Sequence, residues 1–276
     1  MTIRLSILAA FCVGAMQLLA DDPGKEFWSS PWTEVSPQYG VWDEYYRRTD
    51  DPANCSFRFR VMRYAEAIGV EAFVRDDKVV VDNCPRGSIS CETWKDDCLE
   101  VFFDGDNDRN CNTRGPEYET NPTPCNAGGE YAIAANGSTQ SDYASAKKCF
   151  GMLWDGTAEP WEEGGKWVGT HYRLWFRYDC LKRPPPRLDE SVSFGFTICV
   201  HDDDDGGAND LALYWKGNPK IPYADESAFG RVEFPPNTGD AGMSTPECVC
   251  RRQGAVADEF RLRLAQKNEK DVLLKR

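Results

Sequence analysis

One stretch of the chain, residues 93–110, joins a predicted strand to side chains that suit ligand binding. Residues 98–103 alternate in side-chain direction and are rich in β-branched and aromatic types, which predicts a strand whose two faces are both at least half covered. Glu100 shares its face with Cys98 and Phe102, and the opposite face carries Leu99, Val101 and Phe103. Trp94 lies a few residues earlier, at the mouth of this strand. A carboxylate near an aromatic ring suits a polar ligand that has an apolar side. A central strand followed by a solvated acidic turn is the alternative interpretation.

Four consecutive carboxylates form a second candidate site. They are Asp202, Asp203, Asp204 and Asp205. Such a run cannot stay close together and fully ionised without cations or water, and calcium prefers oxygen ligands of this kind. We therefore treat the run as a candidate calcium site, with a solvated acidic loop as the alternative.

The chain carries no specific signal for catalysis. Glycosidases need two carboxylates at a set separation, which Asp97, Glu100, Glu130 and Asp202 could supply. With 45 acidic residues, however, some pair always looks suitable. No nucleophile elbow, phosphate loop or metal-protease motif is present. We expect the protein not to be an enzyme.

Short strands separated by Gly, Pro and Asp turns predict an all-β fold, an antiparallel and jelly-roll-like sandwich. The alternation of residues 56–63 is typical of a half-buried strand. The aromatic-rich segment 21–53 shows no clean period and is predicted to cover a sheet rather than to bind a ligand. The predicted strands are 56–63, 69–74, 78–81, 98–103, 130–135, 151–154, 167–178, 191–200, 211–215 and 229–234.

Composition divides the chain into three parts. Arg4 is followed by an apolar run that ends at Ala20, which predicts a signal peptide over residues 1–20 and a secreted, periplasmic or cell-surface protein. Residues 21–236 form the predicted domain. Residues 237–276 begin with a Pro- and Gly-rich linker and continue as a charged tail that could be helical.

The net charge of −13 restricts the partners. Binding to nucleic acid or to anionic membranes requires clustered Lys and Arg, so we expect neither partner. Neutral glycans or cations fit the charge better.

The cysteine count predicts disulfides. An exported chain with eleven cysteines after the signal segment uses them mainly as disulfides, and the odd count leaves at least one free. Cys98 and Cys199 lie in apolar strands and are expected as small buried hydrophobic residues. The predicted stapled loops hold Cys84, Cys91, Cys111 and Cys125.

Four sequence blocks carry a resemblance. They are Ser-Phe-Arg-Phe-Arg-Val-Met-Arg-Tyr at 56–64 with Gly-Val-Glu-Ala-Phe-Val-Arg-Asp-Asp at 69–77, then residues 94–104, then 193–204, and finally Trp215 with residues 224–232. Their order resembles family 9 carbohydrate-binding modules over about residues 50–235. The resemblance implies a sugar-binding β-sandwich of secreted polysaccharide-degrading systems, with oligo- or polysaccharide as the partner.

The resemblance also implies a site. In that family two aromatic rings clamp a terminal sugar and a glutamate bonds its hydroxyl groups; the matching positions are Trp94, Tyr223 and Glu100. Three positions depart from the family pattern. The family places arginine and asparagine on one strand and glutamine on a later one, where this chain has Ala132, Ala134 and Cys199.

Two other classes of function stay open. A related sandwich serves in haem-binding redox domains, for which the candidate axial ligands are Met62, Met152, His171 and His201. A disulfide-rich structural or surface-interaction protein is the third class.

Overall fold

The computed structural model describes residues 28–236 except 65–66, 90, 106, 108, 110–128, 143–153, 179–186, 188 and 224. The predicted signal peptide, the linker and tail, Met152, Cys111 and Cys125 lie outside the described residues. Within them, no helix is both long and apolar enough to cross a membrane.

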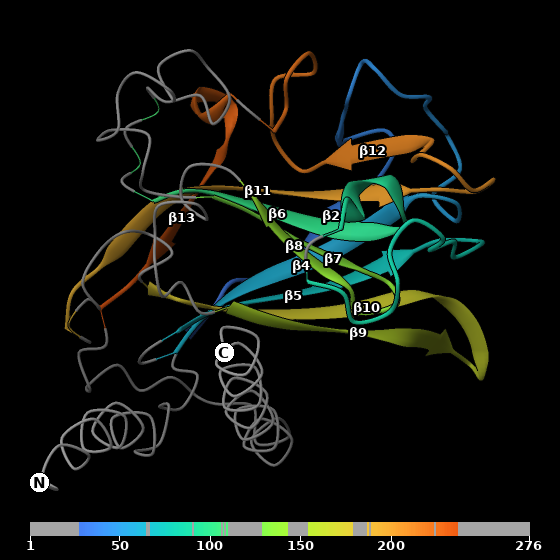
Figure 1. The fold of residues 1–276 in the computed structure, drawn as a ribbon. Helices are drawn as coiled ribbons and strands as arrows, with labels where there is room; N and C mark the ends of the chain where they lie inside the picture. Colours follow the sequence, from blue (N-terminus) through green and yellow to red (C-terminus); the bar gives the residue numbers. More distant parts are fainter. Residues whose placement is uncertain are drawn as a thin grey trace, which may run out of the picture.

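Two antiparallel sheets pack face to face, which confirms the predicted all-β sandwich (Figure 1). Sheet A has the order β1-β4-β5-β10-β9, with β2 paired to β4; sheet B has the order β3-β12-β11-β6-β7-β8, with β13 paired to β11. The strands of sheet A are β1 (Trp28–Ser29), β2 (Thr33–Val35), β4 (Ser56–Arg63), β5 (Ala67–Arg75), β9 (Trp154–Glu163) and β10 (Lys166–Arg177). The strands of sheet B are β3 (Val41–Trp42), β6 (Cys98–Asp104), β7 (Gly129–Ala134), β8 (Thr139–Asp142), β11 (Val192–Asp202), β12 (Leu211–Tyr214) and β13 (Gly230–Phe234).

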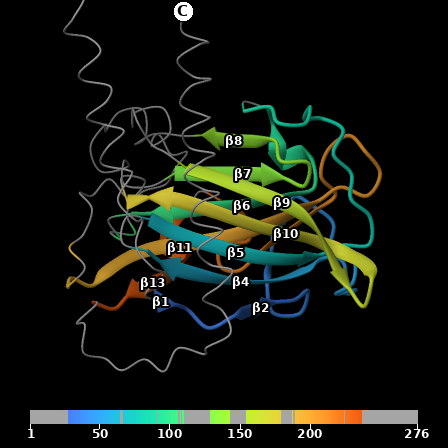
Figure 2. The same cartoon turned by 90° about the horizontal axis from the view of Figure 1, so that it is seen from below.

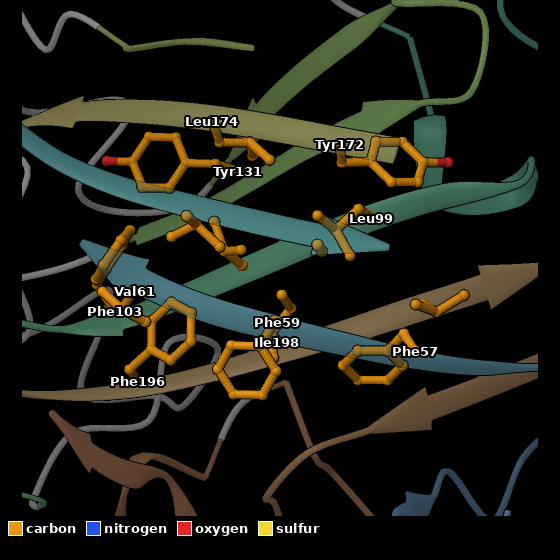
Figure 3. Close-up of a cluster of buried hydrophobic side chains, with 14 of the residues drawn as sticks. Phe57, Phe59, Val61, Leu99, Phe103, Tyr131, Tyr172, Leu174, Phe196 and Ile198 are labelled. Carbon is orange, nitrogen blue, oxygen red and sulfur yellow. The ribbon is translucent and has the colours of Figure 1, made fainter. Parts of the chain in front are cut away.

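The core lies between the two sheets, where every second side chain of the central strands points inward (Figure 3). The ring centroid of Phe59 of β4 lies 6.0 Å from that of Phe196 of β11, and the centroid of Phe103 of β6 lies 5.0 Å from that of Phe176 of β10. Glu100 lies on the strand face opposite Phe103, as the alternation predicted, and because Phe103 faces the core, Glu100 faces outward. The core thus fixes which residues sheet B presents on its outer face.

The β9–β10 hairpin is longer than the sequence indicated. β9 pairs with β10 from Trp154 to Glu163, whereas the prediction ended at residue 154. The strand is polar and contains Pro160, which an edge strand tolerates. Gly164 and Gly165, with φ of 60° and 77°, form its turn. An edge strand buries little, so it carries little hydrophobic alternation to predict it.

Residues 78–81 do not form the predicted strand. The backbone of Val80 bonds instead to one residue of another loop: its N–H donates to the Asp97 carboxylate, and its carbonyl accepts from the Asp97 N–H. Both groups of Val80 are therefore satisfied without a ladder partner.

A disulfide joins Cys84 to Cys91, two of the four cysteines predicted to staple loops. Cys55, Cys98 and Cys199 are free and buried, as expected for Cys98 and Cys199. Burial raises the pKa of all three thiols well above the usual value, so they behave as apolar side chains.

Candidate functional site

A pocket of about 190 Å³ opens on the outer face of sheet B. It is smaller than the roughly 300–1,000 Å³ typical of pockets for drug-sized ligands, so it has room for one ring rather than a long chain. The residues that line it are Asp43, Tyr45, Tyr46, Trp94, Glu100, Glu130, His201, Tyr214 and Tyr223. Trp94, Glu100 and Tyr223, the three residues that the resemblance implied, therefore lie around one cavity.

Glu100 lies on the wall of the pocket, 3 % exposed. Its Oε2 accepts a hydrogen bond of 3.0 Å from Nε2 of His201, and Nδ1 of His201 accepts one of 2.8 Å from the Asn209 amide. This chain of bonds suits a neutral imidazole that carries its proton on Nε2. The other oxygen, Oε1, is buried and has no hydrogen-bond partner among the described residues. A buried carboxylate oxygen without a partner costs free energy unless a ligand donates to it.

The three positions that depart from the family pattern surround Glu100. In the sheet register, Glu100 lies between Ala132 of β7 and Cys199 of β11, and Ala134 lies opposite Cys98. Their small side chains are fully buried and do not line the pocket. Hydrogen bonding to a ligand must therefore come from other residues.

Aromatic rings form the rest of the wall. Trp94 belongs to a 3-10 turn (Thr93–Lys95) that is anchored where the Thr93 N–H and hydroxyl donate to the side-chain oxygen of Gln140. The Lys95 ammonium lies 5.2 Å from the Trp94 ring centroid and pairs with Glu92. Tyr223 is half-buried against an apolar cluster on the outer face of sheet B that contains Phe102, Tyr214 and Phe229.

Sequence reasoning missed the contribution of the segment 43–46. It was predicted to cover a sheet, and Trp42 does so, but Asp43, Tyr45 and Tyr46 line the pocket. These three residues follow β3, which pairs with β12 so that Trp42 lies opposite Leu213, and this pairing places them beside the pocket. No local pattern reveals a pairing so distant in sequence.

Asp43 is 2 % exposed, and its Oδ1 accepts from the Tyr45 N–H at 2.9 Å. Burial raises the pKa of Asp43 above its usual value, although the bond from Tyr45 and the nearness of His201 act in the opposite direction. The Tyr46 phenol also has a raised pKa, chiefly from burial, with further contributions from Asp43 and Glu100. The charges of Asp43 and Glu100 thus both disfavour ionisation of the Tyr46 phenol.

The four aspartates of the predicted calcium run do not share one site, so that prediction needs correction. Asp202 and Asp204 place carboxylate oxygens near Asp76, all within 4.8 Å of one another. Asp203 belongs to other groups, with Asp82 and Asp96 or with Asp205 and Asp210. Asp202 is the last residue of β11, whereas Asp203, Asp204 and Asp205 follow the strand in a loop, so strand geometry does not hold the four side chains on one side.

The Asp76 group has unusual electrostatics. Both carboxylate oxygens of Asp202 are buried without a hydrogen-bond partner among the described residues. Burial, followed by the charges of Asp76 and Asp204, raises the pKa of Asp202 to about 9. Burial likewise raises the pKa of Asp76 to about 7. The group therefore suits a cation.

The candidate haem ligands among the described residues do not converge. Met62 and His171 lie on sheet A and His201 lies on sheet B, while Nε2 of each histidine bonds a glutamate. Cys98, Glu100 and His201 offer three potential metal-ligand atoms within 4.8 Å, but Nε2 of His201 is already bonded to Glu100.

The model of the family described as "Carbohydrate family 9 binding domain-like" matches residues 26–235. The chain belongs to this family. Family 9 carbohydrate-binding modules are non-catalytic, which agrees with the expectation that the chain is not an enzyme. No curated protein matches the chain in sequence.

Solved structures of family 9 modules share the fold. A module from Caldicellulosiruptor kristjanssonii in complex with cellotriose is 15% identical, with a TM-score of 0.50, over 78% of this chain and 94% of that chain. A module from the same organism in complex with glucose is 14% identical, with a TM-score of 0.49, over 75% of this chain and 90% of that chain. At this identity the likeness to the cellotriose complex concerns the fold alone.

Proposed function

We propose that the chain is a secreted, non-catalytic domain that binds the end of an oligo- or polysaccharide in the pocket on sheet B and serves polysaccharide degradation. The unpartnered Oε1 of Glu100, set in a pocket that Trp94 and Tyr223 also line, is the observation that carries this proposal. A sugar hydroxyl can donate to that oxygen while the apolar face of the ring stacks on an aromatic side chain.

Two further observations support the export of the chain and its role in polysaccharide degradation. The apolar segment before Asp21 supports secretion, and the resemblance supports a place beside polysaccharide-degrading enzymes. The relative from C. kristjanssonii was solved with cellotriose, which makes a β-linked glucose oligomer a suitable first ligand.

The test is binding of the purified chain to a glycan array, followed by calorimetry with cellotriose. We expect a dissociation constant between about 10 μM and 1 mM, which corresponds to roughly −7 to −4 kcal/mol. Glu100→Gln removes the charge at nearly constant shape and should weaken binding. Failure of the folded chain to bind any glycan would reject the proposal, and turnover of a polysaccharide by it would contradict the non-catalytic assignment.

We also propose that Asp76, Asp202 and Asp204 hold a calcium ion. Two buried oxygens of Asp202 lack a partner among the described residues, and calcium would satisfy them with ligands that it prefers. The Asn54 amide donates to Asp204 at 3.0 Å, and Lys78 donates to the Asp204 carbonyl, which orients this residue.

The pH dependence of stability tests the calcium site. The pKa of Asp202 is raised on folding, so without metal the folded state should lose stability as pH rises from about 4 toward about 9. Calcium should cancel this loss and raise Tm in EDTA-stripped protein by at least about 4 °C at pH 8, and by less at pH 5. Asp202→Asn should abolish the calcium effect, whereas the exposed Asp189→Asn should preserve it; an equal calcium response in both variants would reject the site.

A further inference from the structure

We propose that the preferred ligand of the pocket is a sugar that carries a free ammonium group, such as a β-linked glucosamine oligomer. The inference rests on the carbohydrate binding proposed above and names the class of sugar. Three features of the pocket support it: its negative charge, with no lysine or arginine among the described lining residues, its aromatic wall, and the unpartnered oxygen of Glu100.

The charge of the pocket is negative. Asp43 and Glu100 are both nearly fully buried, and Glu130 lines the pocket as well. His201 is the one basic residue in the described lining, and both of its ring nitrogens are already hydrogen-bonded, to Glu100 and to Asn209. No lysine or arginine is among the described lining residues. A cation entering this space gains attraction that a neutral hydroxyl group does not, since buried charges are only weakly screened.

The aromatic wall favours the same ligand. Tyr45, Tyr46, Trp94, Tyr214 and Tyr223 surround the cavity, and aromatic faces attract ammonium groups through their quadrupole. The phenol groups of Tyr46 and Tyr214 both lie near Asp43 and Glu100, because the negative charge of each carboxylate helps to raise the pKa of both phenols. The two carboxylates and the two rings therefore enclose one common space.

The unpartnered oxygen of Glu100 also favours an ammonium group over a hydroxyl group. An ammonium group carries three donors, so it can bond Oε1 of Glu100 and still donate to a second acceptor such as Asp43. A hydroxyl group has a single donor and can satisfy only one of these oxygens. An ammonium group also carries a positive charge, which adds a Coulomb attraction to the two carboxylates that a hydroxyl donor lacks.

The test compares three trimers of equal length by calorimetry with the full chain at about pH 6, where a primary amine is protonated. We expect the fully deacetylated glucosamine trimer to bind at least about tenfold more tightly than cellotriose, or roughly 1.4 kcal/mol. The N-acetylglucosamine trimer, whose amide is neutral, should bind no more tightly than cellotriose. Asp43→Asn should reduce the tenfold preference to about threefold or less.

The control variant is Glu233→Gln on β13, which removes the same charge from an exposed position outside the pocket. It should keep the full preference, which separates a local effect from the overall charge of −13. Cellotriose binding as tight as glucosamine binding would overturn the ammonium inference and leave carbohydrate binding intact. If no trimer binds, both proposals fail. A preference that survives Asp43→Asn, or that Glu233→Gln removes equally, would also overturn the inference.

Discussion

The outer faces of the two sheets use similar residues in opposite ways. On sheet A the Arg58 guanidinium lies 4.9 Å from the ring centroid of Phe73, 5.2 Å from that of Trp32 and 5.7 Å from that of Trp161 (Figure 2 shows this sheet in front). The aromatic rings of sheet A are thus covered by cations of the chain itself. On sheet B the rings line an open pocket, and Lys95 beside Trp94 is the one described cation stacked on them.

The carboxylates differ in the same way. On sheet A, Glu71 bonds Arg60 at 2.6 Å and Nε2 of His171 at 2.9 Å. Burial would raise the pKa of Glu71, but His171 and Arg60 outweigh it and lower the pKa to about 2. On sheet B, burial raises the pKa of Asp43, and the bond from Tyr45 and the nearness of His201 do not outweigh it. A carboxylate that is paired with cationic side chains, such as Glu71, stabilises the fold. A pocket carboxylate without an arginine or lysine partner among the described residues, such as Asp43, is available to a ligand.

The largest expected effect comes from breaking the ion pairs of sheet A. Glu71→Gln should lower the free energy of unfolding by about 2–3 kcal/mol, because it leaves Arg60 and His171 mostly buried without a counter-charge. Urea denaturation measures this, with the exposed Glu159→Gln as the control, for which we expect less than about 0.5 kcal/mol. Sugar binding should not change.

The sign of the pH effect provides a further check on Glu71. Its pKa is lowered on folding, so its stabilisation is present above about pH 4.5 and is lost as pH falls toward about 2. The difference in stability between parent and Glu71→Gln should shrink over that range. A constant difference would show that packing, not charge, accounts for the loss.

An intermediate effect is expected from the aromatic rings of the pocket. Trp94→Ala should weaken sugar binding at least about tenfold, or roughly 1.4 kcal/mol, with little change in Tm, because Trp94 lines the pocket and is partly exposed. Trp32→Ala is the matched control on sheet A, and it should leave binding unchanged. If Trp94→Ala unfolds the protein, the side chain belongs to the core; if both variants bind as the parent does, the site lies elsewhere.

The smallest effect is expected at Arg58. Arg58→Met keeps much of the packing and removes the charge, so only the cation–π attraction to the rings is lost, about 0.5–1 kcal/mol of stability. Thermal melts of this variant and of the exposed Arg231→Met measure it. Equal stability of the two variants would mean that stacking on sheet A contributes nothing measurable.

The sequence by itself determined the strands that face the core. Residues 56–63 and 98–103 alternate regularly enough that their position followed, as did the placement of Glu100 on the face opposite Phe103, because side chains along a strand have a period of two. The family resemblance named Trp94, Glu100 and Tyr223, which lie around one pocket. Edge strand β9 was mostly missed, because a polar edge strand carries no such period.

Only the tertiary structure decided what surrounds those three residues. Pairing of β3 with β12 brings Asp43 and Tyr46 to Glu100, and the end of β11 brings Asp202 to Asp76 rather than to its neighbour Asp203. These contacts join residues distant in the chain, and each depends on the register of strands that local sequence does not specify. Local periodicity therefore set the faces of the strands, while the charge and shape of the pocket came from long-range pairing.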